Sequence, residues 1–400
     1  MKKILYLLPR FPTLSETFIA EEIIAVRARG YDVRVISLSQ PRQNELAAMG
    51  PRLRELSSDT VYLKRIPVAV SQLFIALIAS FSDLNNQVSR RRGLSVRGVL
   101  RCLRAAAVAS YAKRTGADMI YAHWPQPSEV ALLAGHMSGL PVALSIHAHE
   151  VAHDNAHFPA AFKAICFAAF CNAAAMRYLL NLLPPDVRQK GHLVYHGVDF
   201  TQFPYRSLPS PGGPLRVVSA GRLTPTKGMD RLVECVAKAR AKGANVHLTI
   251  VGEGSGRDPL MSKVDALGLG DAVQFTGWMA HERIGEEFAK AHLFVLLADT
   301  NFHDGLPNVV LEAMATGRPA ILSPLPAAAE VVTSGVNGVI LAEGDYTEEC
   351  ADLFVELSSD SATIERWGAA AAQAVRDKHD RKVQIDKLCT LFDITMSAHD

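Results

Sequence analysis

Two basic residues in the second half of the chain have the spacing of an anion-binding turn. Arg222 and Lys227 lie five residues apart in a glycine-containing turn that follows an apolar segment. Two fixed positive charges at the start of a helix would neutralise a diphosphate, and they matter most when that diphosphate is leaving. A loop arginine and a loop lysine are more often simply solvated, so the pair alone does not identify a site.

A second turn combines carboxylates with backbone N–H groups. Asp304 and Glu312 lie eight residues apart, after the apolar run 293–297 and around a helix predicted to begin at or near Pro307 and to end at Gly317. Such a turn directs unpaired N–H groups and the positive end of a helix dipole at one point. Carboxylates there suit a hydroxyl-rich ligand, while an ordinary connection with Asp304 as the helix cap is the open alternative.

Two further loops at predicted strand ends could border a ligand. Gly252-Glu253-Gly254 is rich in glycine, which lets a ligand approach the backbone closely. Trp278 could present its ring to a flat base, although a tryptophan that is buried for structural reasons is the commoner explanation.

The strands that must position these residues alternate with helices in both halves of the chain, which indicates parallel α/β layers. The predicted strands are 3–8, 33–38, 60–63, 119–123, 142–147, 192–196, 215–221, 246–251, 273–276, 293–297, 320–323 and 338–341. The predicted helices include 15–29, 96–113 and 128–138. Two doubly wound domains follow from this order, with ligands expected at the carboxyl ends of their strands, in the cleft between them.

A segment with four prolines and two glycines separates the two halves. It predicts a linker at 199–214 between an N-terminal domain at 1–198 and a C-terminal domain at 215–378. Residues 379–400 are predicted to form a helix that packs back on the N-terminal domain.

Composition argues against a disordered protein and against a disulfide-rich one. With 49% hydrophobic and 20% charged residues, the chain is globular, and 400 residues suit two domains. Six scattered cysteines without a CxxC pair fit a reducing compartment. The apolar N-terminal stretch is too short for a signal peptide, so a cytoplasmic location is predicted.

The net charge of +2 hides an asymmetry between the halves. Residues 1–200 hold 23 Lys and Arg against 14 Asp and Glu, whereas residues 201–400 hold 19 against 26. The excess concentrates around Arg90–Arg104, where Arg97, Arg101 and Arg104 are predicted to share a helical face beside the uncharged run 66–81. Such a face suits an anionic membrane surface or a pyrophosphate, or it is a solvated face beside a core helix. No nucleic-acid-binding module is recognisable.

A nicotinamide-dependent enzyme is the first rival for paired α/β domains. Neither opening strand is followed by GxGxxG, since the first leads into Pro9-Arg10-Phe11-Pro12 and the second into Gly221-Arg222-Leu223-Thr224. Dinucleotide binding is therefore disfavoured.

Taken together, the motifs resemble a known family along essentially the whole chain. The matching segments are Gly221-Arg222-Leu223 with Lys227-Gly228, Val251-Gly252-Glu253-Gly254, Asp304-Gly305-Leu306-Pro307-Asn308, Glu312-Ala313-Met314-Ala315-Thr316-Gly317-Arg318-Pro319, Ser145-Ile146-His147-Ala148-His149-Glu150 and Tyr195-His196-Gly197-Val198-Asp199. In order and spacing they resemble retaining nucleotide-sugar glycosyltransferases of family 4, which have the GT-B fold. The opening Phe11-Pro12-Thr13-Leu14-Ser15-Glu16-Thr17-Phe18-Ile19 is similar to the bacterial exopolysaccharide branch of that family, which includes enzymes of the colanic-acid type.

The resemblance implies a role for each matched position. Arg222 and Lys227 would hold the donor diphosphate, and Glu312 would accept hydrogen bonds from the ribose. His147 and Asp304 would act at the transferred sugar. The remaining implied donor-binding residues are Gly252, Glu253, Gly254, Trp278, Gly305, Leu306, Pro307 and Asn308, and the implied acceptor-side residues are Ser15, Glu16, Thr17 and His149.

One position departs from the family pattern. The family's first carboxylate is usually glutamate, whereas this chain has Asp304, which is one methylene shorter. Because the shorter side chain reaches less far, the identity of the donor sugar stays open. No Asp-x-Asp follows a predicted strand, which fits the metal-independent chemistry and the absence of a cofactor that the resemblance implies.

A competing motif is the zinc-protease pattern H-E-x-x-H, which His149-Glu150-Val151-Ala152-His153 satisfies. Zinc catalysis needs this segment to be helical and needs a third ligand. The motif instead begins just after a predicted strand, and the next glutamate is Glu234 in the other domain. A metalloprotease is therefore disfavoured.

The function expected from the resemblance is retaining transfer of a hexose from a nucleotide-diphosphate sugar. The expected acceptor is a saccharide linked to a polyprenyl diphosphate, at the inner face of the cytoplasmic membrane in exopolysaccharide biosynthesis. Two alternatives stay open: a nucleotide-sugar epimerase or phosphorylase of the same fold, and a non-catalytic subunit that binds a sugar nucleotide or a glycan.

Overall fold

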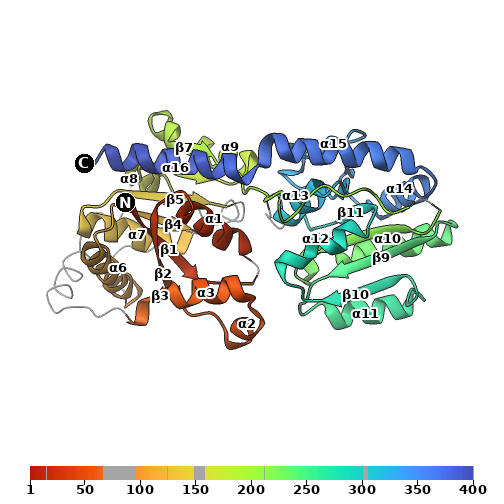
Figure 1. The fold of residues 1–400 in the computed structure, drawn as a ribbon, viewed down its shortest axis with the longest axis horizontal. Coiled ribbons are helices and arrows are strands. Elements are labelled where there is room, and N and C mark those ends of the chain that lie inside the picture. The colour runs from red at the N-terminus through yellow and green to blue at the C-terminus, as the bar shows by residue number, and fades with distance from the viewer. Residues whose placement is uncertain are drawn as a thin grey trace. The chain divides into compact units, whose positions relative to one another are not determined.

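The computed structural model describes residues 1–14, 16–65, 96–123, 125–147, 158–210, 212–300 and 305–399. The chain divides into two compact units (Figure 1). Unit 1 comprises Met1–Tyr195 and Gln384–Asp400, and unit 2 comprises His196–Val383.

Unit 1 contains a parallel sheet of seven strands in the order β3-β2-β1-β4-β5-β6-β7. The strands are β1 (Lys3–Arg10), β2 (Asp32–Ser39), β3 (Val61–Tyr62), β4 (Met119–His123), β5 (Val142–Ile146), β6 (Ala168–Phe170) and β7 (Gly191–Leu193). The helices are α1 (Thr17–Arg27), α2 (Gln43–Ala48), α3 (Pro51–Asp59), α6 (Val96–Thr115), α7 (Pro125–Ser138), α8 (Phe158–Ala164) and α9 (Ala173–Asn181), with 3₁₀ turns at η1 (Leu63–Arg65) and η3 (Pro185–Lys190).

The central strand of unit 1 explains its two cores. Leu5 and Leu7 of β1 pack in one hydrophobic cluster, and Ile4, Tyr6 and Leu8 pack in another. Successive side chains of a strand point to opposite faces of the sheet, so β1 is covered on both faces. This explains why the strand is an unbroken apolar run.

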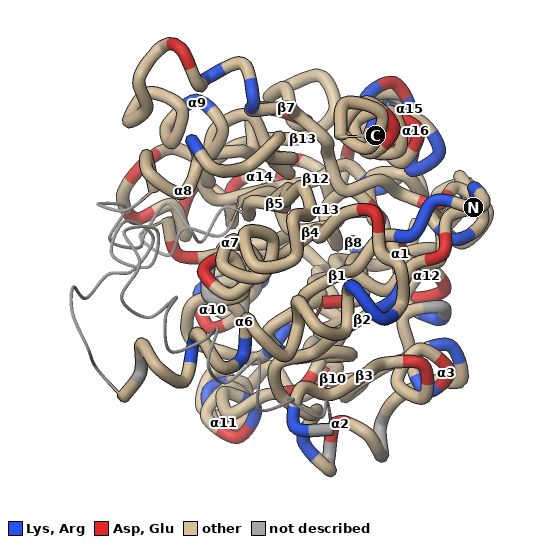
Figure 2. The backbone as a smooth tube through the Cα atoms, turned by 90° about the vertical axis from the view of Figure 1, so that its left-hand side faces the viewer, with Lys and Arg blue, Asp and Glu red and all other residues tan. Residues whose placement is uncertain are grey.

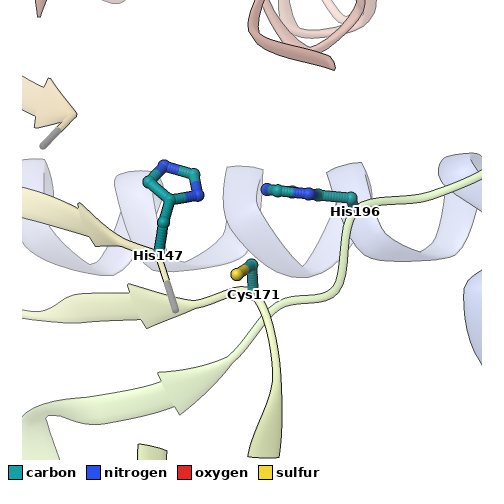
Figure 3. A group of neighbouring side chains, drawn as sticks. All are labelled: His147, Cys171 and His196. Carbon is teal, nitrogen blue, oxygen red and sulfur yellow. The ribbon is translucent and has the colours of Figure 1, made fainter. Parts of the chain in front are cut away.

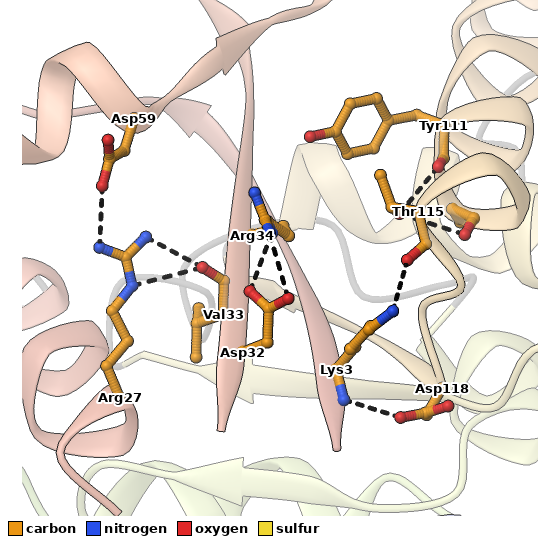
Figure 4. Close-up of polar contacts among 10 residues, drawn as sticks. Lys3, Arg27, Asp32, Val33, Arg34, Asp59, Tyr111, Thr115 and Asp118 are labelled. Carbon is orange, nitrogen blue, oxygen red and sulfur yellow. Dashed lines mark hydrogen bonds and ion pairs between the residues drawn. The ribbon is translucent and has the colours of Figure 1, made fainter. Parts of the chain in front are cut away.

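Polar contacts hold the amino ends of β1 and β2 (Figure 4). The backbone N–H of Lys3 donates to Asp118 Oδ2 at 2.7 Å, and Lys3 Nζ donates to the carbonyl oxygen of Thr115 at 3.1 Å. Arg27 donates to the carbonyl oxygen of Val33 through Nη2 at 2.9 Å. These contacts fix the end of the sheet opposite to the carboxyl ends, where ligands bind in parallel sheets.

Unit 2 contains a parallel sheet of six strands in the order β10-β9-β8-β11-β12-β13 over one hydrophobic core. The strands are β8 (Leu215–Ala220), β9 (Val246–Val251), β10 (Val273–Gly277), β11 (Leu293–Leu296), β12 (Ala320–Leu322) and β13 (Gly338–Ile340). The helices are α10 (Met229–Ala241), α11 (Arg257–Ala266), α12 (His281–Ala289), α13 (Asn308–Ala315), α14 (Thr347–Ser359) and α15 (Ser361–His379), with 3₁₀ turns at η4 (Pro225–Lys227) and η5 (Ala328–Glu330). On α3, α11 and the C-terminal helices, acidic and basic positions are interspersed (Figure 2).

The last helix, α16 (Arg381–Ser397), packs on unit 1, as the sequence predicted. Its Phe392 is fully buried, with its ring centroid 5.1 Å from that of Tyr121 and 6.5 Å from that of Tyr6. Ion pairs add to this packing at the helix surface, between Arg29 and Asp386 at 2.5 Å and between Lys2 and Asp393 at 2.8 Å.

The predicted α/β fold class is confirmed, and the differences are local. Every predicted strand of unit 2 is present, but β6 of unit 1 was missed because three residues, Ala168–Phe170, without a β-branched side chain give little strand signal. The expected strand at 192–196 is shorter and is placed one residue earlier, as β7.

The structure corrects the prediction of a linker at 199–214. These residues belong to unit 2, where Phe203 is 1% exposed and the N–H of Arg206 donates to the carbonyl oxygen of Thr316 at 3.1 Å. The compact units meet along the chain at Tyr195 and His196, and again at Val383 and Gln384. Proline and glycine marked an irregular segment correctly, but irregular backbone can still be packed.

The structure describes only part of the basic face predicted around Arg90–Arg104, and there Arg101 is paired and not solvated. The Arg101 guanidinium pairs with Glu129 at 3.0 Å, and its side chain is only 14% exposed. Arg104 is exposed. The uncharged run 66–81 and Arg90, Arg91 and Arg92 lie outside the described residues, as does the side chain of Arg97. Among the helices that the structure describes, none has both the length and the apolar composition needed to cross a membrane.

Candidate functional site

The strand order of unit 2 reverses between β8 and β11, and the predicted anion-binding turns follow these two strands. β8 is followed by the turn that carries Arg222 and Lys227, and β11 leads to Gly305 and α13. In doubly wound sheets the ligand crevice lies at the carboxyl ends of the strands where the order reverses. The structure therefore brings the two sequence motifs to the expected place in the sheet.

Gly228 fixes the Lys227 turn against the end of β11. Its φ is +65°, and a Cβ atom at this position would lie 1.8 Å from the carbonyl oxygen of Leu297. The N–H of Asp299 donates to the carbonyl oxygen of Thr226 at 2.9 Å. Both the left-handed backbone and the close approach require glycine here, so the position of Lys227 relative to β11 is set by backbone contacts.

The glycine-rich loop after β9 packs on the same turn. A Cβ atom at Gly252 would lie 2.0 Å from the carbonyl oxygen of Gly221, and one at Gly254 would lie 2.3 Å from that of Leu223. The N–H of Leu223 donates to the carbonyl oxygen of Glu253 at 2.9 Å. These glycines therefore let two loops meet backbone to backbone, which is a packing role in addition to the predicted approach of a ligand.

The charged groups of these loops differ in exposure. Arg222 is exposed, and Lys227 is half-buried. The Glu253 carboxylate is held by Arg257 through an ion pair of 3.3 Å. The two predicted phosphate-binding cations therefore lie in one short turn whose backbone is fixed by its neighbours.

Trp278 follows β10 and is 42% exposed. The explanation that it is buried for structural reasons is therefore wrong. An exposed ring at the carboxyl end of a strand is consistent with the predicted contact to a flat base.

Glu312 lies on α13 and is 8% exposed. Its Oε1 accepts a hydrogen bond of 2.8 Å from His281 Nε2, at the start of α12. The ring of His281 in turn packs against that of Phe203, with centroids 5.3 Å apart. The sequence analysis missed His281, because the two residues lie 31 positions apart and no local pattern links them.

The rest of the α13 turn is described from Gly305 onward. Gly305, Leu306, Pro307 and Asn308 are half-buried, and the helix begins at Asn308 with Pro307 as its N-cap, in agreement with the predicted start at or near Pro307. Asn308 Oδ1 is hydrogen-bonded to His196 Nδ1 at 3.0 Å. Asp304 lies outside the described residues.

In unit 1, His147 follows β5 and is 4% exposed, and Cys171 follows β6 (Figure 3). An imidazole nitrogen of His147 and the Cys171 sulfur lie within 4.8 Å of each other. Of the predicted acceptor-side residues, Glu16 is the N-cap of α1 and Thr17 is its first residue. Ser15 and His149 lie outside the described residues, as does the whole H-E-x-x-H motif.

His147 belongs to a buried polar chain that the sequence analysis missed. Its Nε2 lies 3.4 Å from His123 Nδ1, and His123 Nε2 lies 3.2 Å from Glu22 Oε1, which also accepts a hydrogen bond of 3.0 Å from the Tyr6 hydroxyl. Burial raises the pKa of Tyr6 well above its usual range, so the phenol keeps its proton. The available signal was that two neighbouring strands, β4 and β5, both lead into histidine at their carboxyl ends.

This chain is similar to known glycosyltransferases in sequence and in fold. Residues 204–374 match the family model described as glycosyl transferases group 1. The WcaL protein of Salmonella typhimurium, whose name places it as a glycosyltransferase in colanic acid biosynthesis, is 23% identical over 98% of this chain and 99% of its own length. The amylovoran biosynthesis glycosyltransferase AmsK of Erwinia amylovora is 27% identical over 45% of this chain and 45% of its own.

Solved structures share the fold over nearly the whole chain. The Anabaena protein HepE in complex with UDP superposes with a TM-score of 0.75 at 17% identity, covering 98% of this chain and 100% of that one. At this identity the likeness speaks for the fold alone. Residues 204–374 therefore resemble the glycosyl transferases group 1 family, within a chain that has the GT-B fold.

Proposed function

We propose that this protein transfers a hexose from a nucleotide-diphosphate sugar to a saccharide acceptor, with retention of configuration, in bacterial exopolysaccharide biosynthesis. The observation that carries the proposal is the fixed turn of Arg222 and Lys227 at the reversal point of the unit 2 sheet, joined to the end of β11 through Gly228. The names of WcaL and AmsK support the pathway. The complex of HepE with UDP supports a nucleotide diphosphate as the leaving group.

The proposed chemistry needs no nucleophile from the protein. The bond between the anomeric carbon and the diphosphate oxygen breaks, and the acceptor oxygen bonds to the same face of that carbon. The acceptor proton passes to an oxygen of the leaving diphosphate. Arg222 and Lys227 stabilise the charge that develops on this group, and Glu312 accepts hydrogen bonds from the ribose. His147 and Asp304 contact the transferred sugar.

The same pair of cations supports the proposal that neither a metal ion nor a cofactor is required. A divalent ion in other transferases neutralises the diphosphate, and two positive side chains can supply that charge. Because both come from a turn that is fixed by backbone contacts, they need little reorganisation as the bond breaks.

Donor binding and acceptor-dependent turnover test the proposal together. UDP-glucose, UDP-galactose, UDP-N-acetylglucosamine and GDP-mannose are compared by thermal shift, because a ligand at about 100 times its dissociation constant adds about 2.7 kcal/mol to the stability of the folded state. We expect one of them to raise the melting temperature and to be turned over faster with a saccharide acceptor. Conversion of the donor at the same rate without acceptor would instead favour an epimerase, and binding without any turnover would favour a non-catalytic subunit.

We further propose that the acceptor is linked to a lipid diphosphate and that the protein works at the inner face of the cytoplasmic membrane. The exposed side of α6 supports this. Val96 is 87% exposed and Leu100 is 46% exposed, and the exposed Arg104 follows on the same face. Apolar side chains beside a cation suit the surface of an anionic bilayer.

Flotation with phosphatidylglycerol vesicles tests the membrane proposal. We expect binding at low salt that weakens as the ionic strength rises, because salt screens the attraction of Arg104 to the lipid headgroups. The double variant Val96→Ser and Leu100→Ser should float less, whereas Val336→Ser in unit 2, at a position that is 53% exposed, should float like the wild type. Absence of flotation even at low salt would contradict membrane docking.

A further inference from the structure

Four side chains form a continuous polar chain inside unit 1, from His147 through His123 and Glu22 to Tyr6. His147 directly follows β5, and the other three lie on β4, α1 and β1, so only the folded unit brings them together. His123 and Tyr6 are fully buried, and the Glu22 side chain is 14% exposed. We propose that Glu22 and His123 are positioning residues that hold the proton of His147 on Nε2 and so orient this ring for the transferred sugar. This inference deepens the proposed function and rests on it.

The position of Glu22 on its helix is the first argument. The buried residues of α1 include Ile19, Ile23 and Val26, at the spacing of an apolar face. Glu22 lies between them on that face, directed at the sheet and not at solvent. Burying a carboxylate costs free energy unless it is paired or hydrogen-bonded. Its partners here are the His123 ring and the Tyr6 hydroxyl.

The direction of the hydrogen bonds follows from the chemistry of each group. An ionised carboxylate can only accept, so His123 Nε2 donates its proton to Glu22 Oε1 over 3.2 Å. When the ring of His123 carries this single proton, its lone pair is on Nδ1. That lone pair accepts from His147 Nε2 over 3.4 Å, which places the proton of His147 on Nε2.

Ser145 fits the same assignment. Its Oγ lies 3.3 Å from His147 Nε2, and it is also hydrogen-bonded to the Tyr121 side chain. Both contacts of His147 Nε2 are longer than a typical single hydrogen bond, as expected when one N–H is shared between two acceptors. Ring packing also restrains His147, whose ring centroid lies 5.3 Å from that of Phe18.

The consequence for recognition is chemical. With its proton on Nε2, the neutral His147 ring carries its accepting lone pair on Nδ1. A lone pair accepts a hydrogen from a hydroxyl group and repels an anionic oxygen. This chain of hydrogen bonds from Glu22 through His123 to His147, here called the relay, therefore prepares His147 to bind a hydroxyl of the transferred sugar. It does not suit the diphosphate, which the cations of unit 2 are proposed to bind.

The tautomer of His147 is the first readout, and it does not depend on transferase activity. We expect ¹⁵N spectra of the full-length protein at about pH 8, where an ordinary imidazole is neutral, to show a protonated Nε2 and an unprotonated Nδ1. The signals are assigned by their loss in His147→Asn. A proton on Nδ1, or an equal mixture of tautomers, would overturn the proposal.

Two substitutions of His123 then test the relay itself. His123→Asn keeps an acceptor near the position of Nδ1, whereas His123→Leu removes it. We expect the Leu variant to lose the fixed tautomer and to lower kcat by about tenfold with KM little changed, as expected for a partner that acts through another side chain. The Asn variant should retain the tautomer and most of the activity. His136→Leu, at an exposed position on α7, is the matched control.

The outcomes separate this inference from the proposed function. Turnover is measured with each of the four nucleotide sugars used for the thermal shifts. If the wild type converts none of them, the proposed function fails while the ¹⁵N result still decides the relay. If the Leu and Asn variants have equal activity and the same His147 tautomer, the relay is wrong although the transferase function stands.

Discussion

Replacing Lys227 by alanine is expected to lower kcat for sugar transfer by about 10²–10³-fold, or about 2.7–4 kcal/mol, which is the effect of removing one fixed electrostatic contact to a developing negative charge. The charge on the diphosphate grows as its bond to the sugar breaks, so the loss falls on the transition state more than on the bound donor. The turn itself should keep its structure, because Gly228 and the Asp299 N–H hold it through backbone contacts. Steady-state kinetics, together with the melting temperature of the variant, measure this.

Lys242→Ala is the matched control for Lys227→Ala. Lys242 lies in the same unit, but it pairs at the surface with Glu348 and Asp352, both at 2.5 Å. Exposed ion pairs contribute little to stability, and Lys242 lies at the opposite end of α10 from the Lys227 turn, so turnover should stay near that of the wild type. Glu312→Ala should also abolish most transfer, by weakening donor binding. Near-normal turnover of Lys227→Ala or of Glu312→Ala would contradict the site assignment.

Replacing Arg318 by alanine is expected to destabilise unit 2 by about 3–5 kcal/mol. The substitution removes a buried guanidinium and leaves the backbone carbonyl oxygens that accept its hydrogen bonds without a donor. Arg318 is fully buried. Each of its five N–H donors reaches a backbone carbonyl oxygen. The acceptors are Ala291 at 2.9 Å, Arg206 at 3.0 Å, Ser207 at 2.9 Å, Ala289 at 3.0 Å, and Thr316.

These five contacts join three separate segments of unit 2, at 206–207, 289–291 and 316. Burial lowers the pKa of Arg318 to about 10, which is the cost of placing the guanidinium away from water. Arg318→Lys should recover little of the lost stability, because a compact ammonium with three donors cannot span the same acceptors.

Urea unfolding followed by tryptophan fluorescence measures the effect, since Trp278 and Trp367 both lie in unit 2. Arg366→Ala, at an exposed position on α15, is the control and should change stability by no more than about 0.5 kcal/mol. A loss of less than about 1 kcal/mol for Arg318→Ala would show that the carbonyl groups find other partners. It would also mean that contacts other than those of Arg318 hold residues 199–214 on unit 2.

Much of the fold could be predicted because local patterns of apolar residues, glycine and proline mark its strands and turns. Apolar runs such as 293–297 become buried parallel strands wherever helices cover both faces of a sheet, so their position along the chain is enough to place them. The turn of Arg222 and Lys227 could be predicted for the same reason, since it directly follows such a run. β6 could not, because a strand of three residues is formed by its neighbours more than by its own side chains.

The sequence by itself determined the two α/β units, the parallel arrangement of their strands and the loops at the carboxyl ends, because each depends on residues that are close together in the chain. Only the tertiary structure decided the partners of the site residues. His281 meets Glu312 across 31 positions, and His123 meets Glu22 across 101. Arg318 holds part of the predicted linker on unit 2 by donating hydrogen bonds to the carbonyl oxygens of Arg206 and Ser207. Because every residue has a carbonyl group, no residue type marks these acceptors in the sequence. Hydrogen bonds between distant residues leave no periodic pattern in the sequence, because their geometry exists only after the sheets and helices have come together.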